Sequence, residues 1–344
     1  MNYIKRMWDK QGISYVDVSS SRIRRKLWNQ CFTRFGFSFE RFGRRYSKFR
    51  RSRFLTDAYV EEICSNSSIR WAYARWGFFD HEAAWNRSDY LTLTDNHEQE
   101  LRNFRAQVQI DGDYICALSR DDEFYPHQNE NNGRNIDFTY YLPALDRLSR
   151  EGVYSLRVGA KQKAYPQEIF NKHVIDYSGR FRSEELDVLL VARCKFVLSC
   201  TSGYCLMAYL FGKPCAVINY TPLLLELPFS PHDIYIPQMI WDKERKRLLT
   251  FREIADYDLC YSPTSMTNIA SGWGSLELVK TGPDAIADVA LELNNVIDGK
   301  YCYSADDNYL QESFRKLFKH YHGPRNTPAR VGKVFLEQNE HLFR

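Results

Sequence analysis

The chain has 344 residues, of which 44% are hydrophobic and 15% aromatic, so it can bury the core of one large or two ordinary globular domains. This composition excludes a protein that is disordered over most of its length. The formal net charge is +4, but residues 1–53 carry fifteen Lys and Arg against three acids, whereas the rest carries thirty-two against forty. Only the N-terminal segment is therefore basic.

Nine cysteines are spread along the chain without a CxxC pair, and several lie inside apolar runs. This pattern favours reduced thiols in a reducing compartment over a disulfide framework or a structural zinc site. The N-terminus lacks the apolar core of a signal peptide, and no apolar run reaches membrane-spanning length. We expect a cytoplasmic protein, either soluble or peripheral on the membrane.

The basic segment, residues 1–53, interleaves arginines with aromatic residues. Such a segment can lie on anionic lipid, form a solvated or partner-packed face, or contact nucleic acid. No nucleic-acid-binding module follows it, so we predict no nucleic-acid partner. We divide the chain into this segment, a small mixed or helical part over 54–110, and a larger domain over 111–344.

Regular elements begin near residue 95. The pattern predicts a helix capped by Thr94 or Asp95 and ending near Val108, and then a strand over 114–118. A polar loop over 119–135 precedes a helix over 138–150, a strand over 154–158 and a short strand over 175–177. Ser183 then opens a helix over 184–193.

The stretch from 195 to 222 predicts one βαβ unit. It has a buried strand over 196–199, a polar turn over 200–203, an apolar helix over 204–211 ended by Gly-Lys-Pro, and a second strand over 215–218. Alternating strands and helices predict a Rossmann-type parallel sheet with helices on both faces. Neither a P-loop nor a GxGxxG motif occurs, which argues against an NTPase or an ordinary dinucleotide enzyme.

The turn at the start of the apolar helix is a candidate anion site. Backbone N–H groups at Gly203 and Tyr204 would face a ligand, and Thr201 and Ser202 add hydroxyl groups. The alternative is structural: the two hydroxyls cap the helix and Gly203 permits close packing. Because ligands of parallel sheets bind at the carboxyl ends of strands, we expect this turn to converge with the turns at 119–121 and 157–159.

The chain from about 95 to 344 resembles a family of bacterial surface-polysaccharide glycosyltransferases whose carboxyl half is similar to the nucleotide-sugar domain of GT-B enzymes. The resemblance is carried by YICALSRDDEFY (114–125), the segment 133–159, the segment 174–203, FGKPCAVINYTP (211–222), RLLTFREI (247–254) and ARVGKVFLEQNEHL (329–342). Where members of the family have His-x-Arg after the first strand, this chain has Leu118-Ser119-Arg120. The arginine is kept and the histidine is not.

The resemblance implies a GT-B-like fold with a shortened N-terminal portion, and transfer of a sugar from a nucleotide-sugar donor to a glycan or lipid-linked acceptor. It implies no metal and no further cofactor, because basic side chains and helix N-termini stabilise the leaving diphosphate. The predicted donor site consists of Arg120, Arg134, Asn135, Arg157, Gly159, Asp176, Ser183, Thr201, Ser202, Gly203 and Tyr204. Arg120 is also predicted to act in catalysis, with Asp121 as general base.

Structural alternatives remain for these residues. Arg120 beside Asp121 can form an exposed ion pair, Arg134 can serve its loop, and the acids after Arg120 can be a solvated turn. Two other functions also stay open. One is a sugar-nucleotide epimerase, and the other is a catalytically weak nucleotide-binding or scaffold protein, which the missing histidine and the short N-terminal portion favour.

Overall fold

The computed structural model describes residues 93–121, 123, 133–160, 163–220, 230–256, 275–318 and 329–343. The chain divides into two compact units, residues 1–80 and 81–344, and every described residue belongs to the second. The basic segment 1–53 and its predicted lipid contact lie outside the described residues, as does most of the predicted part 54–110. No helix in the described part is long and apolar enough to cross a bilayer.

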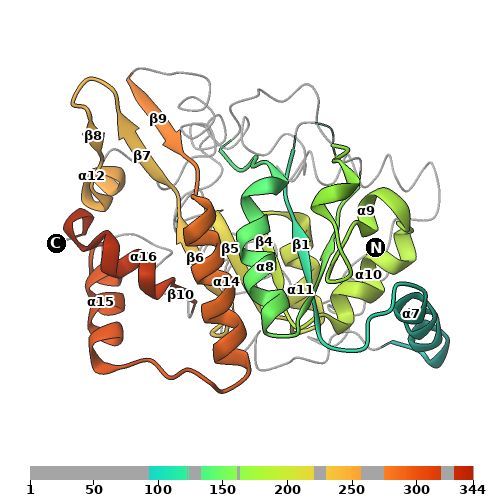
Figure 1. Ribbon diagram of the computed structural model, residues 1–344. Helices are drawn as coiled ribbons and strands as arrows, with labels where there is room; N and C mark the ends of the chain where they lie inside the picture. The colour runs from blue at the N-terminus through green and yellow to red at the C-terminus, as the bar shows by residue number, and fades with distance from the viewer. Residues whose placement is uncertain are drawn as a thin grey trace, which may run out of the picture. The chain divides into compact units, whose positions relative to one another are not determined.

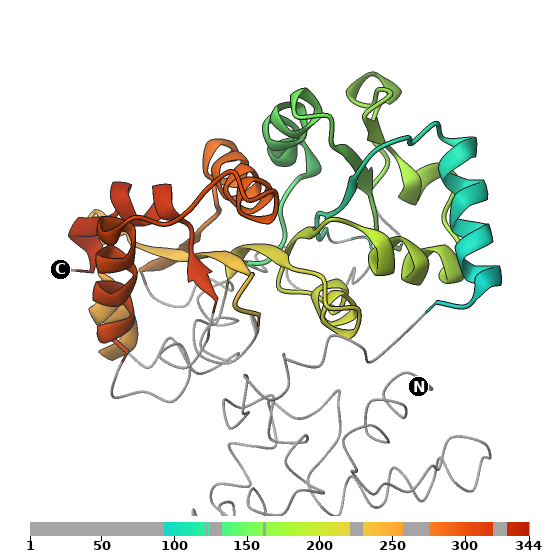
Figure 2. The same ribbon diagram turned by 90° about the horizontal axis from the view of Figure 1, so that it is seen from below.

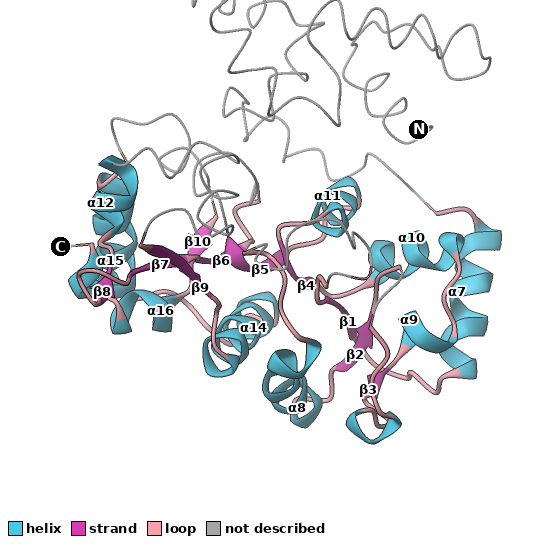
Figure 3. Ribbon diagram, turned by 90° about the horizontal axis from the view of Figure 1, so that it is seen from above, coloured by secondary structure: helices cyan, strands magenta, loops and turns pink. Residues whose placement is uncertain are grey.

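A seven-stranded sheet forms the centre of this unit, and every strand pair in it is parallel. Its order is β3-β2-β1-β4-β5-β6-β10 (Figure 3). The strands are β1 (Tyr114–Leu118), β2 (Tyr154–Arg157), β3 (Val174–Ile175), β4 (Val197–Cys200), β5 (Cys215–Tyr220), β6 (Ile234–Pro237) and β10 (Arg330–Val331). Along the chain, β2 and then β3 are added on one side of β1, and β4 afterwards pairs with the other side of β1. The strand order therefore reverses between β1 and β4.

Helices cover both faces of the sheet. On one face α8 (Leu142–Arg150) packs against α14 (Pro283–Ile297), and α16 (Lys333–Gln338) packs beside α14. On the other face lie α10 (Glu184–Arg193) and α11 (Gly203–Leu210), with α7 (Asp95–Gln107) against α10. Figures 1 and 2 show α14 and α8 side by side, with α11 across the strands from them. The predicted doubly covered parallel sheet is confirmed.

Burial explains why these segments form central strands and helices. Every residue of β1, β4 and β5 is buried, as expected for strands with helices on both faces. The predicted cap of α10 is confirmed, since the Ser183 hydroxyl accepts a hydrogen bond from the Leu186 N–H at 3.1 Å. Thr94 caps α7 in a reciprocal capping box with His97.

Two predicted elements differ from the structure. The predicted helix over 138–150 is a 3₁₀ turn, η1 (Phe138–Tyr141), followed by α8. Pro143 in the first turn of α8 has no N–H, so α-type hydrogen bonding cannot continue through it. The predicted strand over 175–177 ends at Ile175, because Asp176 caps the short helix α9 (Tyr177–Arg180) by accepting a hydrogen bond from the Gly179 N–H.

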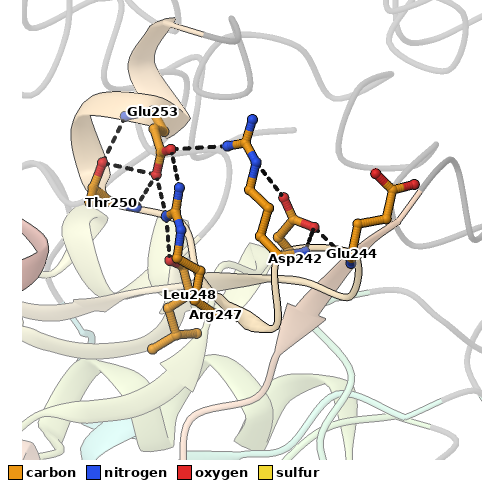
Figure 4. Close-up of polar contacts among 7 residues, drawn as sticks. Asp242, Glu244, Arg247, Leu248, Thr250 and Glu253 are labelled. Atoms are coloured by element: carbon orange, nitrogen blue, oxygen red, sulfur yellow. Dashed lines mark hydrogen bonds and ion pairs between the residues drawn. The ribbon is translucent and has the colours of Figure 1, made fainter.

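A smaller antiparallel sheet, which sequence patterning did not predict, follows β6. Its order is β8-β7-β9, from β7 (Met239–Asp242), β8 (Arg247–Leu248) and β9 (Leu276–Val279). A polar cluster joins its β7–β8 turn to α12 (Phe251–Asp256), as Figure 4 shows. In that cluster Glu253 accepts hydrogen bonds from Arg247 and Thr250, and the Arg247 contact, followed by those of Thr250, lowers the pKa of Glu253 to about 2. The remaining described elements are η2 (Gln167–Ile169), α15 (Ala305–Lys316) and η3 (Glu340–Leu342).

A half-buried acid, Glu292, ties α14 to the C-terminal elements. The carboxylate of Glu292 accepts hydrogen bonds from the Tyr303 hydroxyl and from the Lys333 N–H, both at 2.8 Å. Burial raises the pKa of Glu292 to about 7, against the lowering effect of these two bonds and of Arg330. The folded state therefore holds a proton on Glu292 that the unfolded chain releases near pH 4.5.

We expect Glu292→Gln to remove a pH dependence of stability. The pKa of Glu292 is higher in the folded protein than in the unfolded chain. Its contribution to stability is therefore complete below pH 4.5 and is lost as the pH rises through about 7. The variant should match the unmodified protein near pH 4.5 and exceed its free energy of unfolding by up to roughly 3 kcal/mol near pH 8. Urea unfolding at both pH values measures this difference. Glu337→Gln, at an exposed acid on α16, is the control and should not change with pH in this way.

Candidate functional site

The reversal of strand order places two polar turns next to each other. The chain leaves β1 toward α8 on one face and leaves β4 toward α11 on the other face. Such a switch point opens a crevice at the carboxyl ends of the two strands, which is where parallel sheets bind ligands. The predicted turns at 119–121, 157–159 and 201–203 follow β1, β2 and β4, so all three lie at this carboxyl edge.

The turn between β4 and α11 leaves the start of the helix without a side-chain cap. Ser202 is the N-cap residue of α11 but makes no capping hydrogen bond. Its hydroxyl instead lies 3.0 Å from the Ser199 hydroxyl. The Thr201 side chain is 2% exposed, and its hydroxyl has no hydrogen-bond partner in the described part of the chain. The structural alternative, that both hydroxyls cap the helix, is therefore wrong for Ser202.

Gly203 is exposed, and a Cβ atom built on it would meet no heavy atom within 4 Å. Space is therefore open in front of the first turn of α11, where backbone N–H groups carry partial positive charge. The predicted site residue Tyr204 contributes its backbone there, while its ring is buried and its hydroxyl lies 3.4 Å from Asp187. This arrangement suits an anion.

Two of the predicted arginines lie near the same turn. Burial raises the pKa of the Cys200 thiol at the end of β4, and the positive charges of Arg134 and Arg120 act against that rise. Both guanidinium groups are therefore within electrostatic reach of the carboxyl end of β4. Arginine suits phosphate at such a position because it stays charged and can bind two oxygens at once.

The segment Gly133–Ile136 brings Arg134 to the edge of the sheet. At one end, the Gln238 side-chain amide donates a hydrogen bond to the Gly133 carbonyl at 2.8 Å. At the other end, the Ile136 N–H donates to the Arg120 carbonyl at 2.9 Å. Asn135, between them, is 8% exposed. A Cβ atom on Gly133 would lie 2.4 Å from Leu278, so this close approach requires glycine.

The predicted base Asp121 joins two loops. One carboxylate oxygen accepts a hydrogen bond from the Glu123 N–H at 3.1 Å, and the other accepts from the Lys163 N–H at 2.8 Å. These contacts tie the loop after β1 to the loop after β2, which favours a structural role. The role of Asp121 as a general base stays a prediction.

Arg157 is buried and forms an ion pair with Asp176, whose side chain is 12% exposed. The Arg157 side chain is 1% exposed, and its guanidinium donates to Asp176 at 3.0 Å and to the Lys163 carbonyl. It also lies over the rings of Tyr165 and Phe138, with centroids at 4.8 and 5.4 Å. The ion pair gives both residues a structural role, and their predicted donor contacts stay predictions.

Two further predicted residues also have structural roles. Gly159 has a positive φ of 126°, which favours glycine, and its carbonyl accepts a hydrogen bond from Ser178 at 2.8 Å. Ser183 caps α10. Their contacts show how the loops are held and do not test a donor contact.

Two surface hollows, of about 460 and 400 Å³, lie along the β3 side of the sheet. Both are lined in part by Gln107, Arg180 and Phe181. Neither hollow is lined by residues of the turns that follow β1 and β4, and we place the candidate site at the switch point, where parallel sheets bind ligands. Among the described residues, no group of three or more His, Cys, Asp or Glu side chains could hold a metal ion.

No protein-family model, no curated protein and no solved structure matches this chain. What can be stated of its class comes from the sheet: a Rossmann-like α/β unit with the strand reversal between β1 and β4.

We expect Arg157→Met to destabilise the fold without weakening ligand binding. The substitution leaves the Asp176 carboxylate buried without its charged partner, which should lower the free energy of unfolding by about 3–5 kcal/mol. Asp176→Asn in the same chain should restore part of this loss. Chemical unfolding measures both. A stable Arg157→Met protein that no longer binds nucleotide would instead make Arg157 a ligand contact.

We expect Gly133→Ala to displace Arg134 from the edge of the sheet. The added methyl group overlaps Leu278 and the Gln238 amide, so the segment must shift, at a cost of about 1–3 kcal/mol in stability. Nucleotide affinity should fall about tenfold or more, since a charged hydrogen bond is lost. The control is Gly112→Ala before β1, where a Cβ atom meets its nearest neighbour at 3.4 Å. Equal nucleotide affinity in the two variants would contradict the role of the segment.

Proposed function

We propose that the chain is a glycosyltransferase that moves a sugar from a nucleotide-sugar donor to a glycan or lipid-linked acceptor in bacterial surface-polysaccharide synthesis. One observation carries the proposal. The Thr201 hydroxyl, buried and without a hydrogen-bond partner among the described residues, lies at the uncapped start of α11, at the switch point of a doubly wound sheet and within electrostatic reach of Arg120 and Arg134. The family resemblance of the sequence supports the same chemistry.

The proposed donor binds with its diphosphate at the turn Thr201–Gly203. The first N–H groups of α11 and the guanidinium groups of Arg120 and Arg134 then offset the negative charge of the phosphates. In the reaction, the bond from the anomeric carbon to the diphosphate oxygen breaks and a bond to the acceptor oxygen forms. The bonding electrons leave with the diphosphate, so fixed positive charge at this turn stabilises the transition state.

The acceptor hydroxyl must lose its proton as it attacks. Asp121 is the proposed base, since it follows β1 at the same edge, and the proton then resides on its carboxylate. A GT-B-like arrangement, in which residues 111–344 bind the nucleotide sugar, belongs to the proposal. Docking of residues 1–53 on anionic lipid belongs to it as well, because it would bring the enzyme to lipid-linked acceptors in the cytoplasm.

The epimerase alternative requires acidic and histidine groups in the cleft. His127 follows β1 in the part of that loop that lies outside the described residues, so the two reactions are separated by experiment. Incubation with a bound nucleotide sugar separates the two reactions. Release of free nucleoside diphosphate only in the presence of an acceptor indicates transfer, whereas a new nucleotide sugar indicates epimerisation.

We expect Gly203→Leu to abolish nucleotide binding while the fold remains intact. The new side chain enters space that is open in the protein, so it obstructs only a ligand at the turn. Thermal shift of the full chain with the 5′-diphosphates of uridine, guanosine and adenosine should show stabilisation of the unmodified protein by at least one of them, and none for the variant.

The matched control is Ala305→Leu, which places the same side chain at the first position of α15, another exposed helix start. This variant should bind the nucleotide like the unmodified protein. Unchanged nucleotide affinity in a folded Gly203→Leu protein would remove the anion turn, and with it the proposed donor site.

A further inference from the structure

Three neighbouring strands each end in a buried polar side chain with an unsatisfied atom. These are Thr201 after β4, Asn219 near the end of β5, and Gln238 just after β6, with exposed fractions of 2%, 0% and 2%. The hydroxyl of Thr201, the amide nitrogen of Asn219 and the amide oxygen of Gln238 have no hydrogen-bond partner in the described part of the chain. Native proteins rarely leave such groups unpaired, and each occurrence requires an explanation.

The orientation of the Asn219 amide is set by its neighbours. Its side-chain oxygen accepts a hydrogen bond from the Thr281 N–H at 2.7 Å, and the backbone N–H of Asn219 donates to the Thr281 hydroxyl at 3.2 Å. The unpaired atom is therefore the NH₂ group, a donor. Thr281 directly precedes Gly282, the N-cap of α14, which is exposed and makes no side-chain cap. The free donor thus lies at the uncapped start of α14.

The Gln238 amide is oriented in the opposite sense. Its nitrogen donates to the Gly133 carbonyl at 2.8 Å, which leaves the side-chain oxygen as the unpaired atom, an acceptor. The backbone N–H of Gln238 donates to the Tyr220 carbonyl at 3.1 Å. Gln238 therefore lies beside the end of β5, next to Asn219.

The unpaired donor of Asn219 and the unpaired acceptor of Gln238 are both uncharged, and together they determine which chemical groups can bind. A phosphate or carboxylate accepts hydrogen bonds from Asn219 but, when ionised, has no hydrogen to give to Gln238. A hydroxyl group both donates and accepts, so two neighbouring hydroxyls on one ring satisfy both amides. The pair is thus suited to a sugar ring, in contrast to the anion turn after β4.

We propose that Asn219 and Gln238 form a neutral subsite for the hydroxyl groups of a sugar ring, next to the phosphate-binding turn. This inference deepens the proposed function and rests on it, because the phosphate at α11 brings the ring to β5 and β6. The ring is either the ribose of the nucleotide or the transferred sugar. Both present neighbouring hydroxyls, and the choice of probes separates them.

The test uses Asn219→Asp in the full chain. Aspartate tolerates the positive φ of 47° at this position and keeps the oxygen that accepts from Thr281, but it removes the donor. The probes for calorimetry are inorganic pyrophosphate and, for uridine, guanosine and adenosine, the nucleoside diphosphate, its 2′-deoxy form and its glucose ester.

We expect each probe that carries the hydroxyl bound by Asn219 to bind the variant about tenfold more weakly, and pyrophosphate to bind with nearly unchanged affinity. A loss shared by the nucleoside diphosphate and its glucose ester, and absent for the 2′-deoxy form, assigns the subsite to ribose. A loss confined to the glucose ester assigns it to the transferred sugar. Asn219→Gly, which also suits a positive φ, carries the same test if the aspartate variant does not fold.

The matched control is Asn294→Asp. Asn294 is another fully buried asparagine whose amide lacks a partner in the described part of the chain, but it lies eleven residues beyond the start of α14. Its substitution should change stability and leave the affinity for every probe unchanged.

Three results would overturn the subsite. Unchanged affinity for all probes in Asn219→Asp would show that the amide is satisfied by a buried water only. A loss that is equal or larger for pyrophosphate would show a charge effect rather than a lost donor. Failure of every probe to bind the unmodified protein would reject the donor site as well as the subsite. If nucleotide-sugar binding depends on Asn219 but the protein transfers no sugar, the subsite is supported and only the proposed transferase activity is rejected.

Discussion

Parallel pairing of β1 with β4 is the constraint on which the rest of this unit depends. Parallel strands cannot be joined by tight turns, so the connections from β1 to β2, from β3 to β4 and from β4 to β5 cross a face of the sheet through α8, α10 and α11. The chain adds β2 and β3 on one side of β1 and adds β4, β5 and β6 on the other side. As a result α8 lies on one face of the sheet, and α10 and α11 lie on the other. The carboxyl ends of all these strands then lie at one edge of the sheet. The chain adds strands in opposite directions on the two sides of the β1–β4 pair.

The polar groups at this edge fall into two kinds. Arg157 and Asp176 are charged and form an ion pair, with the Lys163 carbonyl and two aromatic rings around the guanidinium, although the Arg157 Nε has no hydrogen-bond partner in the described part of the chain. They hold together the loops that follow β2 and β3. Thr201, Asn219 and Gln238 are buried and uncharged, and each of them also has an unpaired atom in the described part of the chain. An unpaired buried group costs about 1–3 kcal/mol, so the second kind reduces stability where the first supports it. Costs of this kind are accepted at functional sites.

The Gly133–Ile136 segment links the two halves of the edge. It is held by Gln238 at one end and by the Arg120 carbonyl at the other, so the position of Arg134 depends on contacts from β1 and from the region after β6. The same glutamine therefore positions an arginine through its nitrogen and offers its oxygen to the proposed sugar ring. Phosphate and sugar recognition would then be coupled through one side chain.

The sequence by itself determined the α/β class, the βαβ unit around β4, the Ser183 cap and the polar turns at the carboxyl ends of β1 and β4, because apolar periodicity and capping residues act over a few neighbouring positions. It also pointed to Arg120, Arg134, Thr201 and Gly203, which lie in those turns or next to them. The roles of Arg157 and Asp176 could not be read in this way, since a buried arginine is a ligand contact or a structural ion pair according to what faces it. Asn219 and Gln238 carried no local signal at all. Their unpaired atoms are defined by Thr281 and Gly133, which are 62 and 105 residues away along the chain, and only the tertiary structure brings such distant residues together.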